Sequence, residues 1–264
     1  AIFFMSHVKV QGRPLIFRTA DYYNWPGGDS WTRFHAFDPT VRRDAIIIGS
    51  SHAYRGYDPA VFAKRGYQVY NLGSSAQTPL NSYNIIKYYL DSANCPLLIF
   101  DVYEGTFINS GLESTADLTQ NITSDKAAVG MVWDLRQLRG ANMIALRWAT
   151  PHRRPYYESE HPVVSGFEAL PDSVTKALAP QNDSALVIPD RQKEFLGACI
   201  RLCRERGIRM VISQHYARRG TNALRHATFA NMIDSMRTGT DVPYFDYTLA
   251  PASTTWTTLQ TITT

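Results

Sequence analysis

The sequence is poor in cysteine and contains no long apolar run. Only three cysteines occur among 264 residues, and Cys199 lies four residues before Cys203 in a stretch with helical periodicity. That spacing differs from a CxxC redox or zinc motif, and three cysteines make no disulfide framework. We interpret them as small buried residues. No apolar stretch is long enough to span a bilayer.

Cofactor and nucleic-acid motifs are also absent. No GxGxxG follows the first predicted strand, and no His, Cys, Asp or Glu cluster has metal-ligand spacing. We therefore expect no cofactor and no metal. The net charge is +4, but the basic residues occur as scattered pairs such as Arg42 and Arg43, without a known binding motif. We interpret them as solvated surface and expect no nucleic-acid partner.

The chain has enough apolar residues for one sizeable core, with 44% hydrophobic and 12% aromatic residues. Short apolar runs alternate with helical patterns, as in βαβ units. This pattern predicts an α/β fold, a three-layer α/β/α sandwich with a parallel sheet of about five strands. The strands are expected at 44–51, 67–73, 96–103, 208–216 and 242–247, and the helices at 58–66, 78–93, 125–149, 190–207 and 221–239.

The chain is predicted to form one main domain with additions. Its first residues, AIFFM, suggest that a signal anchor preceded them and was removed or is missing. The helix over 125–149 is expected to be broken or strained at Gly140. The predicted parts are an N-terminal excursion (1–43), the α/β domain (44–250), an insertion within it (about 104–189), and an atypical Thr-rich tail (251–264).

Polar residues follow four of the predicted strands. The loops read GSSH, NLGSS, DVYEG and SQHY. Ligands of open parallel sheets bind beyond the carboxyl ends of the strands, so we expect these loops to form the site. The candidate site residues are Ser50, Ser51, His52, Gly73, Ser74, Ser75, Tyr103, Glu104, Gln214 and His215.

A serine at a strand-to-helix turn can act as a nucleophile if a base takes its proton and N–H donors hold the oxyanion. The candidate nucleophile is Ser51, and the alternative is a structural turn serine. Its neighbour His52 is an unfavourable base, because adjacent residues at a helix start rarely reach each other in the required geometry. Asp101 and Glu104 are candidates to orient a base or substrate, or to be buried pair partners.

The strand-end motifs resemble those of the SGNH (GDSL-like) hydrolases, in the order IIIGSSH, YNLGSS and DVYEGTF. The resemblance implies a flavodoxin-like SGNH fold with Ser51 as nucleophile and Ser50 in the place of the family's Asp. It also implies that the backbone N–H groups of Ser51 and Gly73 bind the oxyanion. The Asn of the family's third block is absent from DVYEGTF. The GSSH form is familiar among bacterial cell-envelope members of the family.

The largest departure from the family lies at the C-terminus, where Asp-x-x-His is missing and seven of the last fourteen residues are Thr. A shift of reading frame is one hypothesis. With suitable synonymous codons, reading one nucleotide back turns Ser253–Thr264 into a segment that ends in Asp-x-x-His, and the coding DNA would test this. Within this chain the base is either His215 or missing.

The resemblance therefore leads to two functional hypotheses. The first is a serine esterase or acyl transfer enzyme, impaired by the missing Asp-x-x-His. Its substrate would be a small ester or acylated glycan, with O-acetyl the expected group, in the bacterial periplasm or cell envelope. The second is a non-catalytic scaffold or glycan-binding protein of the same shape. Ser50, His52, Tyr103 and Glu104 are expected to line the site in either function.

Overall fold

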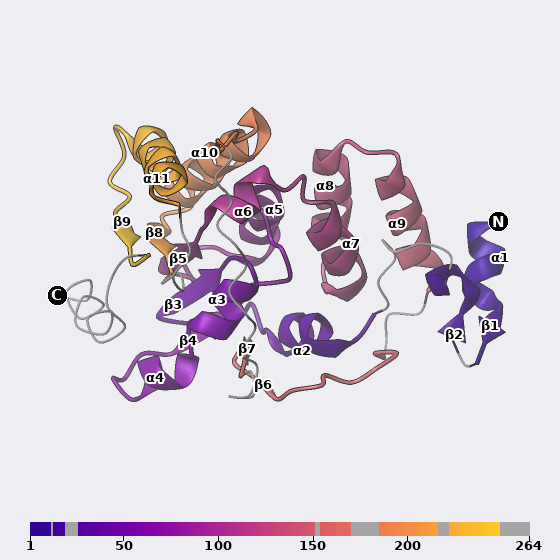
Figure 1. The fold of residues 1–264 in the computed structure, drawn as a ribbon. Helices are drawn as coiled ribbons and strands as arrows, with labels where there is room; N and C mark the ends of the chain where they lie inside the picture. The colour runs from indigo at the N-terminus through magenta and orange to yellow at the C-terminus, as the bar shows by residue number, and fades with distance from the viewer. Residues whose placement is uncertain (12, 19–25, 151–153, 170–184, 216–221, 249–264) are drawn as a thin grey trace.

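A five-stranded parallel sheet forms the centre of the protein, whose structure is a computed structural model (Figure 1). The structure describes all residues except 12, 19–25, 151–153, 170–184, 216–221 and 249–264. The strands lie in the order β4–β3–β5–β8–β9, and every neighbouring pair is parallel. Their bounds are β3 (Ala45–Ile48), β4 (Val69–Asn71), β5 (Leu97–Asp101), β8 (Arg209–Gln214) and β9 (Tyr244–Asp246). The predicted parallel sheet is confirmed.

Helices cover both faces of the sheet, as predicted for a three-layer sandwich. The alternation of side chains along β3 shows the two layers: Ile46 and Ile48 belong to the larger apolar core, whereas Ile47 belongs to a smaller one on the opposite face. The larger core is covered by α5 (Pro79–Tyr89), α10 (Asp190–Glu205) and α11 (Ala223–Arg237), and the smaller by α3 (Ser51–Gly56) and α4 (Pro59–Ala63).

The strand order reverses beside β3. The chain runs from β3 to β4 on one side of it, then crosses over to β5 on its other side. A crevice forms where neighbouring connections leave a parallel sheet in opposite directions, and the carboxyl ends of the strands face it. The ends of β3 and β5 therefore mark the expected position of a ligand site. Residues 49–52 and 101–104 begin at these ends.

Residues 104–149, which follow β5, are mainly helical and share the larger core. It holds α6 (Glu104–Ile108), α7 (Leu112–Asn121), α8 (Asp125–Leu135) and α9 (Arg139–Ala149). The predicted break at Gly140 is wrong. The chain turns at Arg136, whose left-handed φ of 52° ends α8, and Gly140 lies buried inside α9. A Cβ on Gly140 would come within 2.6 Å of Val132 Cγ1, so this glycine lets the two helices approach closely.

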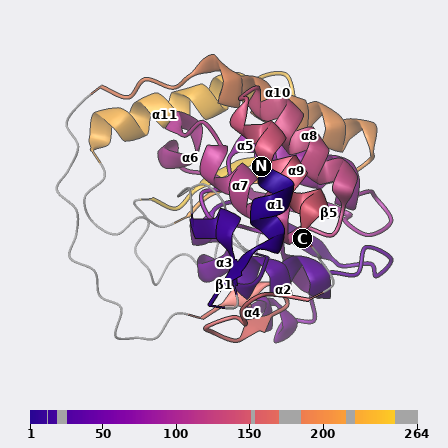
Figure 2. The ribbon, with the colours of Figure 1, turned by 90° about the vertical axis from the view of Figure 1, so that its right-hand side faces the viewer.

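The N-terminal residues form small elements and one helix that joins the main core. They are α1 (Ile2–His7), β1 (Lys9–Val10), β2 (Arg13–Pro14), a 3-10 helix (Leu15–Arg18) and α2 (Gly28–Ala36). Phe34 of α2 and Phe37 after it pack in the larger core. Figure 2 shows α1 and β1 on the side of the molecule where α9 lies. Among the described residues, no helix is both long and apolar enough to cross a membrane.

A short hairpin, β6 (Val163–Val164) and β7 (Phe167–Glu168), lies against the edge strand β4. The carbonyl of Ser165 accepts a hydrogen bond from the backbone N–H of Asn71 at 2.9 Å. Gly166 has a φ of 82°, and a Cβ there would lie 1.8 Å from the carbonyl oxygen of Asn71. The turn can therefore seat against β4 only with glycine at this position.

We predict that Gly166→Ala destabilises the fold much more than Gly66→Ala. Gly66 has a similar φ of 85°, but a Cβ added to it would have no atom within 4 Å, so its substitution tests backbone strain alone. We expect Gly66→Ala to cost about 1 kcal/mol and Gly166→Ala about 3 kcal/mol or more, because the hairpin must move. Urea unfolding followed by circular dichroism measures both. Equal losses would show that the hairpin does not seat as described.

Candidate active site

Ser50 and Ser51 lie at the junction of β3 and α3 and have different environments. The strand was expected to reach Ser51, but it ends at Ile48, and α3 begins at Ser51. Ser50 is fully buried and caps α3, accepting a hydrogen bond from the N–H of His52 at 3.3 Å. Ser51 is half-buried, and its hydroxyl has no hydrogen bond to another described residue. Ser51 is therefore the serine with an available hydroxyl.

Gly49 brings the end of β3 close to the end of β5. Its φ is 150°, and a Cβ there would lie 2.8 Å from the carbonyl oxygen of Asp101 and 2.9 Å from the side chain of Ala53. The chain can turn here only without a side chain. The turn therefore brings the start of α3 close to Asp101 at the end of β5.

Asp101 and His215 form a buried pair across neighbouring strands. Asp101 is the last residue of β5, and His215 directly follows β8. His215 Nδ1 lies 3.0 Å from each carboxylate oxygen of Asp101, whose side chain is fully buried. The carboxylate can only accept, so Nδ1 carries the proton and donates it, which leaves Nε2 as the basic nitrogen. The structure thus brings the candidate base and the candidate orienting carboxylate together.

Tyr57 holds the same carboxylate from the α3 side. Its hydroxyl donates a hydrogen bond to Asp101 Oδ1 at 3.1 Å and lies 2.6 Å from Ser213 Oγ. Burial, with the charge of Asp101, raises the pKa of Tyr57 well above its ordinary value, so it remains a donor. Asp101 therefore receives two hydrogen bonds in a dry environment, which stabilise its charge.

His52 packs directly on His215. Their rings are parallel within 10°, with centroids 4.3 Å apart, and the Tyr103 ring is inclined by 64° to His52, with centroids 4.6 Å apart. Burial and the neighbouring His215 lower the pKa of His52 to about 4. Burial also disfavours charge on His215, but the charge of Asp101 and its hydrogen bond outweigh this and raise the pKa of His215. Of the two rings, His215 therefore takes up a proton first.

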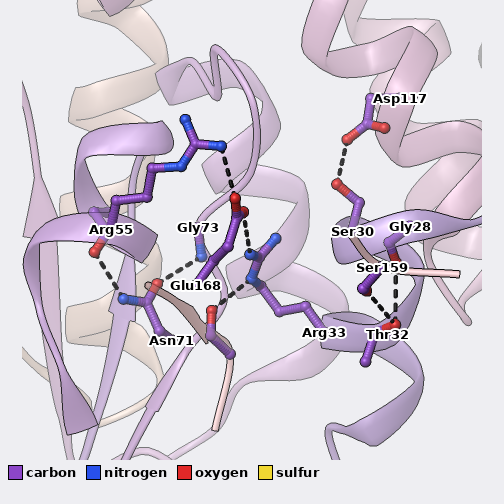
Figure 3. A network of polar contacts seen from close by, with 12 residues as sticks. Gly28, Ser30, Thr32, Arg33, Arg55, Asn71, Gly73, Asp117, Ser159 and Glu168 are labelled. Carbon is purple, nitrogen blue, oxygen red and sulfur yellow. Dashed lines mark hydrogen bonds and ion pairs between the residues drawn. The ribbon is translucent and has the colours of Figure 1, made fainter. Parts of the chain in front are cut away.

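Gly73 and Glu104 lie at the strand ends but have other partners. The Gly73 N–H donates to Asn71 Oδ1 at 3.0 Å, as Figure 3 shows, so this donor is not available to an oxyanion in this structure. Glu104 pairs with Arg225 of α11, with 3.2 Å between Oε1 and Nε. Glu104 therefore anchors α11 and does not pair with His215.

A buried cluster of charges fixes α3 from the other side (Figure 3). Arg55 of α3 donates to Glu168 of the hairpin at 2.8 Å. Arg33 of α2 donates from Nε to the carbonyl of Gly166 at 2.7 Å, and its guanidinium lies 4.1 Å from the centre of the Tyr54 ring. Arg33 is fully buried, and its Nη2 is 3.9 Å from Glu168. Breaking a buried pair leaves an uncompensated charge, so this cluster resists movement of α3.

Sequence reasoning named His215 as a candidate base and Asp101 as a candidate orienting group, but it did not pair them. It missed Tyr57 and Ser213. Ser213 gave a usable signal, because a polar residue in an apolar strand two positions before His215 lies on the same face of the sheet. Tyr57 gave no such signal. The Thr-rich tail, where the family's Asp-x-x-His is expected and missing, lies outside the described residues, since 249–264 are not described.

Comparisons with protein-family models, with curated proteins and with solved structures find no match. Within the described residues, no group of three His, Cys, Asp or Glu side chains is arranged to hold a metal ion. What the site can do chemically is therefore argued from its own geometry. A half-buried serine hydroxyl lies at the start of a helix whose second residue stacks on a carboxylate-bound imidazole.

We predict separate titrations for the two stacked histidines. His215 should titrate above its ordinary value of 6.5 and His52 well below it. Asp101→Asn should lower the His215 pKa by about one pH unit or more, because it removes the stabilising charge. Glu104→Gln is the matched control and should leave His215 unchanged. Nitrogen-detected NMR of the histidine rings measures this, and a His215 pKa below that of His52 would contradict the geometry.

Proposed function

We propose that this chain is a serine-dependent esterase or acyl transfer enzyme, with Ser51 as nucleophile, His215 as base and Asp101 as the orienting carboxylate. The observation that carries the proposal is the hydrogen bond that His215 Nδ1 donates to Asp101, beside the helix that begins with Ser51. An imidazole held in this way presents a basic nitrogen in a fixed orientation. The pair would take the role of the Asp-x-x-His that the tail lacks.

In the proposed reaction, Ser51 Oγ attacks the acyl carbonyl and its proton passes to His215 Nε2. The imidazolium is stabilised by Asp101, and it returns the proton to the leaving alcohol as the tetrahedral intermediate collapses. Water or an acceptor hydroxyl then releases the acyl group by the same route. Ser51 Oγ and His215 share no hydrogen bond in this substrate-free structure, and such bonds commonly tighten only when substrate binds.

The backbone N–H of Ser51 is the remaining candidate donor to the oxyanion. It is the first N–H of α3 and has no partner among the described residues, so it can point to a ligand. The expected second donor, from Gly73, would first have to leave Asn71. That requirement favours the alternative function, a non-catalytic scaffold or glycan-binding protein with the same site shape.

The substrate class rests on the resemblance of the GSSH, NLGSS and DVYEG motifs to bacterial envelope members of the SGNH hydrolases. We propose a small ester or acylated glycan, with an O-acetyl group as the acyl part, and the periplasm or cell envelope as the location. The half-buried Ser51 hydroxyl and the adjoining His52 and Tyr103 rings offer polar groups that suit an oxygen-rich ligand.

We predict that Ser51→Ala abolishes hydrolysis of p-nitrophenyl acetate, with a fall of about a thousandfold or more toward the uncatalysed rate. Ser75→Ala is the control and should keep the wild-type rate, because Ser75 bonds Glu113 and not the histidine pair. Equal rates for wild type and Ser51→Ala would exclude Ser51 as nucleophile. Equal background rates for all three proteins would favour the scaffold.

The pH dependence should follow His215. The base must be neutral, so the rate should rise as the pH passes through the raised His215 pKa, above 6.5. Asp101→Asn should move this midpoint to lower pH and also reduce the maximal rate. The pH profile of kcat/KM measures both effects. A midpoint that is the same in Asp101→Asn and wild type would show that His215 is not the base.

A further inference from the structure

One end of the molecule exposes large apolar side chains from three neighbouring helices. Phe4 of α1 is 67% exposed, Trp148 of α9 69%, Trp133 of α8 79%, and Leu138 between α8 and α9 is 95% exposed. We call this region the α1–α9 end. The helix α9 contacts both α1 and α8, and Figures 1 and 2 show the three helices on the same side of the molecule. Exposed apolar residues that occur singly are ordinary, but such a group indicates a contact surface.

Two sequence segments that contribute to the α1–α9 end contain basic residues and no acidic ones. Residues 1–18 contain three basic residues and no Asp or Glu, and residues 136–149 contain three arginines and no Asp or Glu. Lys9 and Arg136 are exposed, whereas Arg147 is buried in an ion pair. Exposed positive charge therefore lies shortly after α1, at Lys9, and shortly before α9, at Arg136.

The acidic residues of α8 already have partners. Asp125 pairs with Arg147, with 2.7 Å between Oδ1 and Nε, and Asp134 accepts a hydrogen bond from Asn84 Nδ2 at 2.8 Å. Arg136 at the end of α8 is exposed, whereas Asp134 is half-buried against Asn84. The α1–α9 end combines tryptophan, phenylalanine and leucine with basic side chains.

We propose that the α1–α9 end binds the surface of an anionic lipid bilayer. Tryptophan and phenylalanine favour the region between lipid headgroups and acyl chains, and lysine and arginine are attracted to anionic headgroups. A symmetric contact with a second copy of the chain would bring like positive charges together, which argues against self-association. This proposal does not rest on the proposed catalysis.

The direct test is co-sedimentation of the full chain with vesicles. Vesicles of phosphatidylcholine containing about a third phosphatidylglycerol should bind the protein, and pure phosphatidylcholine vesicles should bind it more weakly. Binding should weaken as salt is raised from low to high concentration, because the charge attraction is screened. Absence of binding to the anionic vesicles at low salt would overturn the proposal.

Single substitutions at exposed positions assign the surface without touching the core. Phe4→Gln and Trp148→Gln should each weaken vesicle binding about tenfold, and Lys9→Ala about fivefold. Leu224→Gln is the matched control, because Leu224 is 70% exposed on α11 outside this end and should bind like wild type. Equal binding by all four variants would overturn the assignment.

Two further measurements separate lipid binding from catalysis and from self-association. Ser51→Ala should bind vesicles like wild type, so a failed activity assay leaves this test intact. Light scattering after gel filtration measures the mass of the chain without lipid. A dimer that Trp148→Gln dissociates, in a protein that does not bind vesicles, would identify the α1–α9 end as a contact between copies and overturn the lipid proposal.

Discussion

The site depends on one constraint, the burial of a carboxylate at the end of the central strand β5. Asp101 has no exposed side-chain surface, so its charge requires donors from the protein. Tyr57 supplies one from the segment that follows α3, and His215 supplies another from the segment that follows β8. A single buried group thus fixes how the helix of the candidate nucleophile, the sheet and the imidazole lie relative to one another.

The opposite side of α3 is held by a second set of buried charges. Arg33 and Arg55 both approach Glu168, and burial raises the pKa of this carboxyl group despite the hydrogen bond from Arg55. Through Arg33 and Gly166 the hairpin is bound to α2, and through Asn71 it is bound to β4. The helix that begins with Ser51 is therefore clamped between two polar clusters. Such support keeps a site within the narrow geometry that catalysis needs.

The sequence was sufficient to predict the sheet, because buried parallel strands are continuous apolar runs and DAIIIG is one of them. It was less informative where the structure depends on packing between distant segments. The turn between α8 and α9 falls at Arg136, in a left-handed conformation that glycine or asparagine usually adopts, while Gly140 serves close helix contact. The pairing of Asp101 with His215 required the register of β5 on β8, which a single sequence does not give.

That register explains how His215, directly after β8, meets Asp101 at the end of β5. Asp101 lies directly beside Ser213, and side chains two residues apart on a strand share a face, so His215 faces the α3 layer together with Ser213. Ser213 bonds Tyr57 on that same face. Any imidazole at the position after β8 would meet the carboxylate that ends β5. The fold thus offers a position for the proposed base that is independent of residues 249–264.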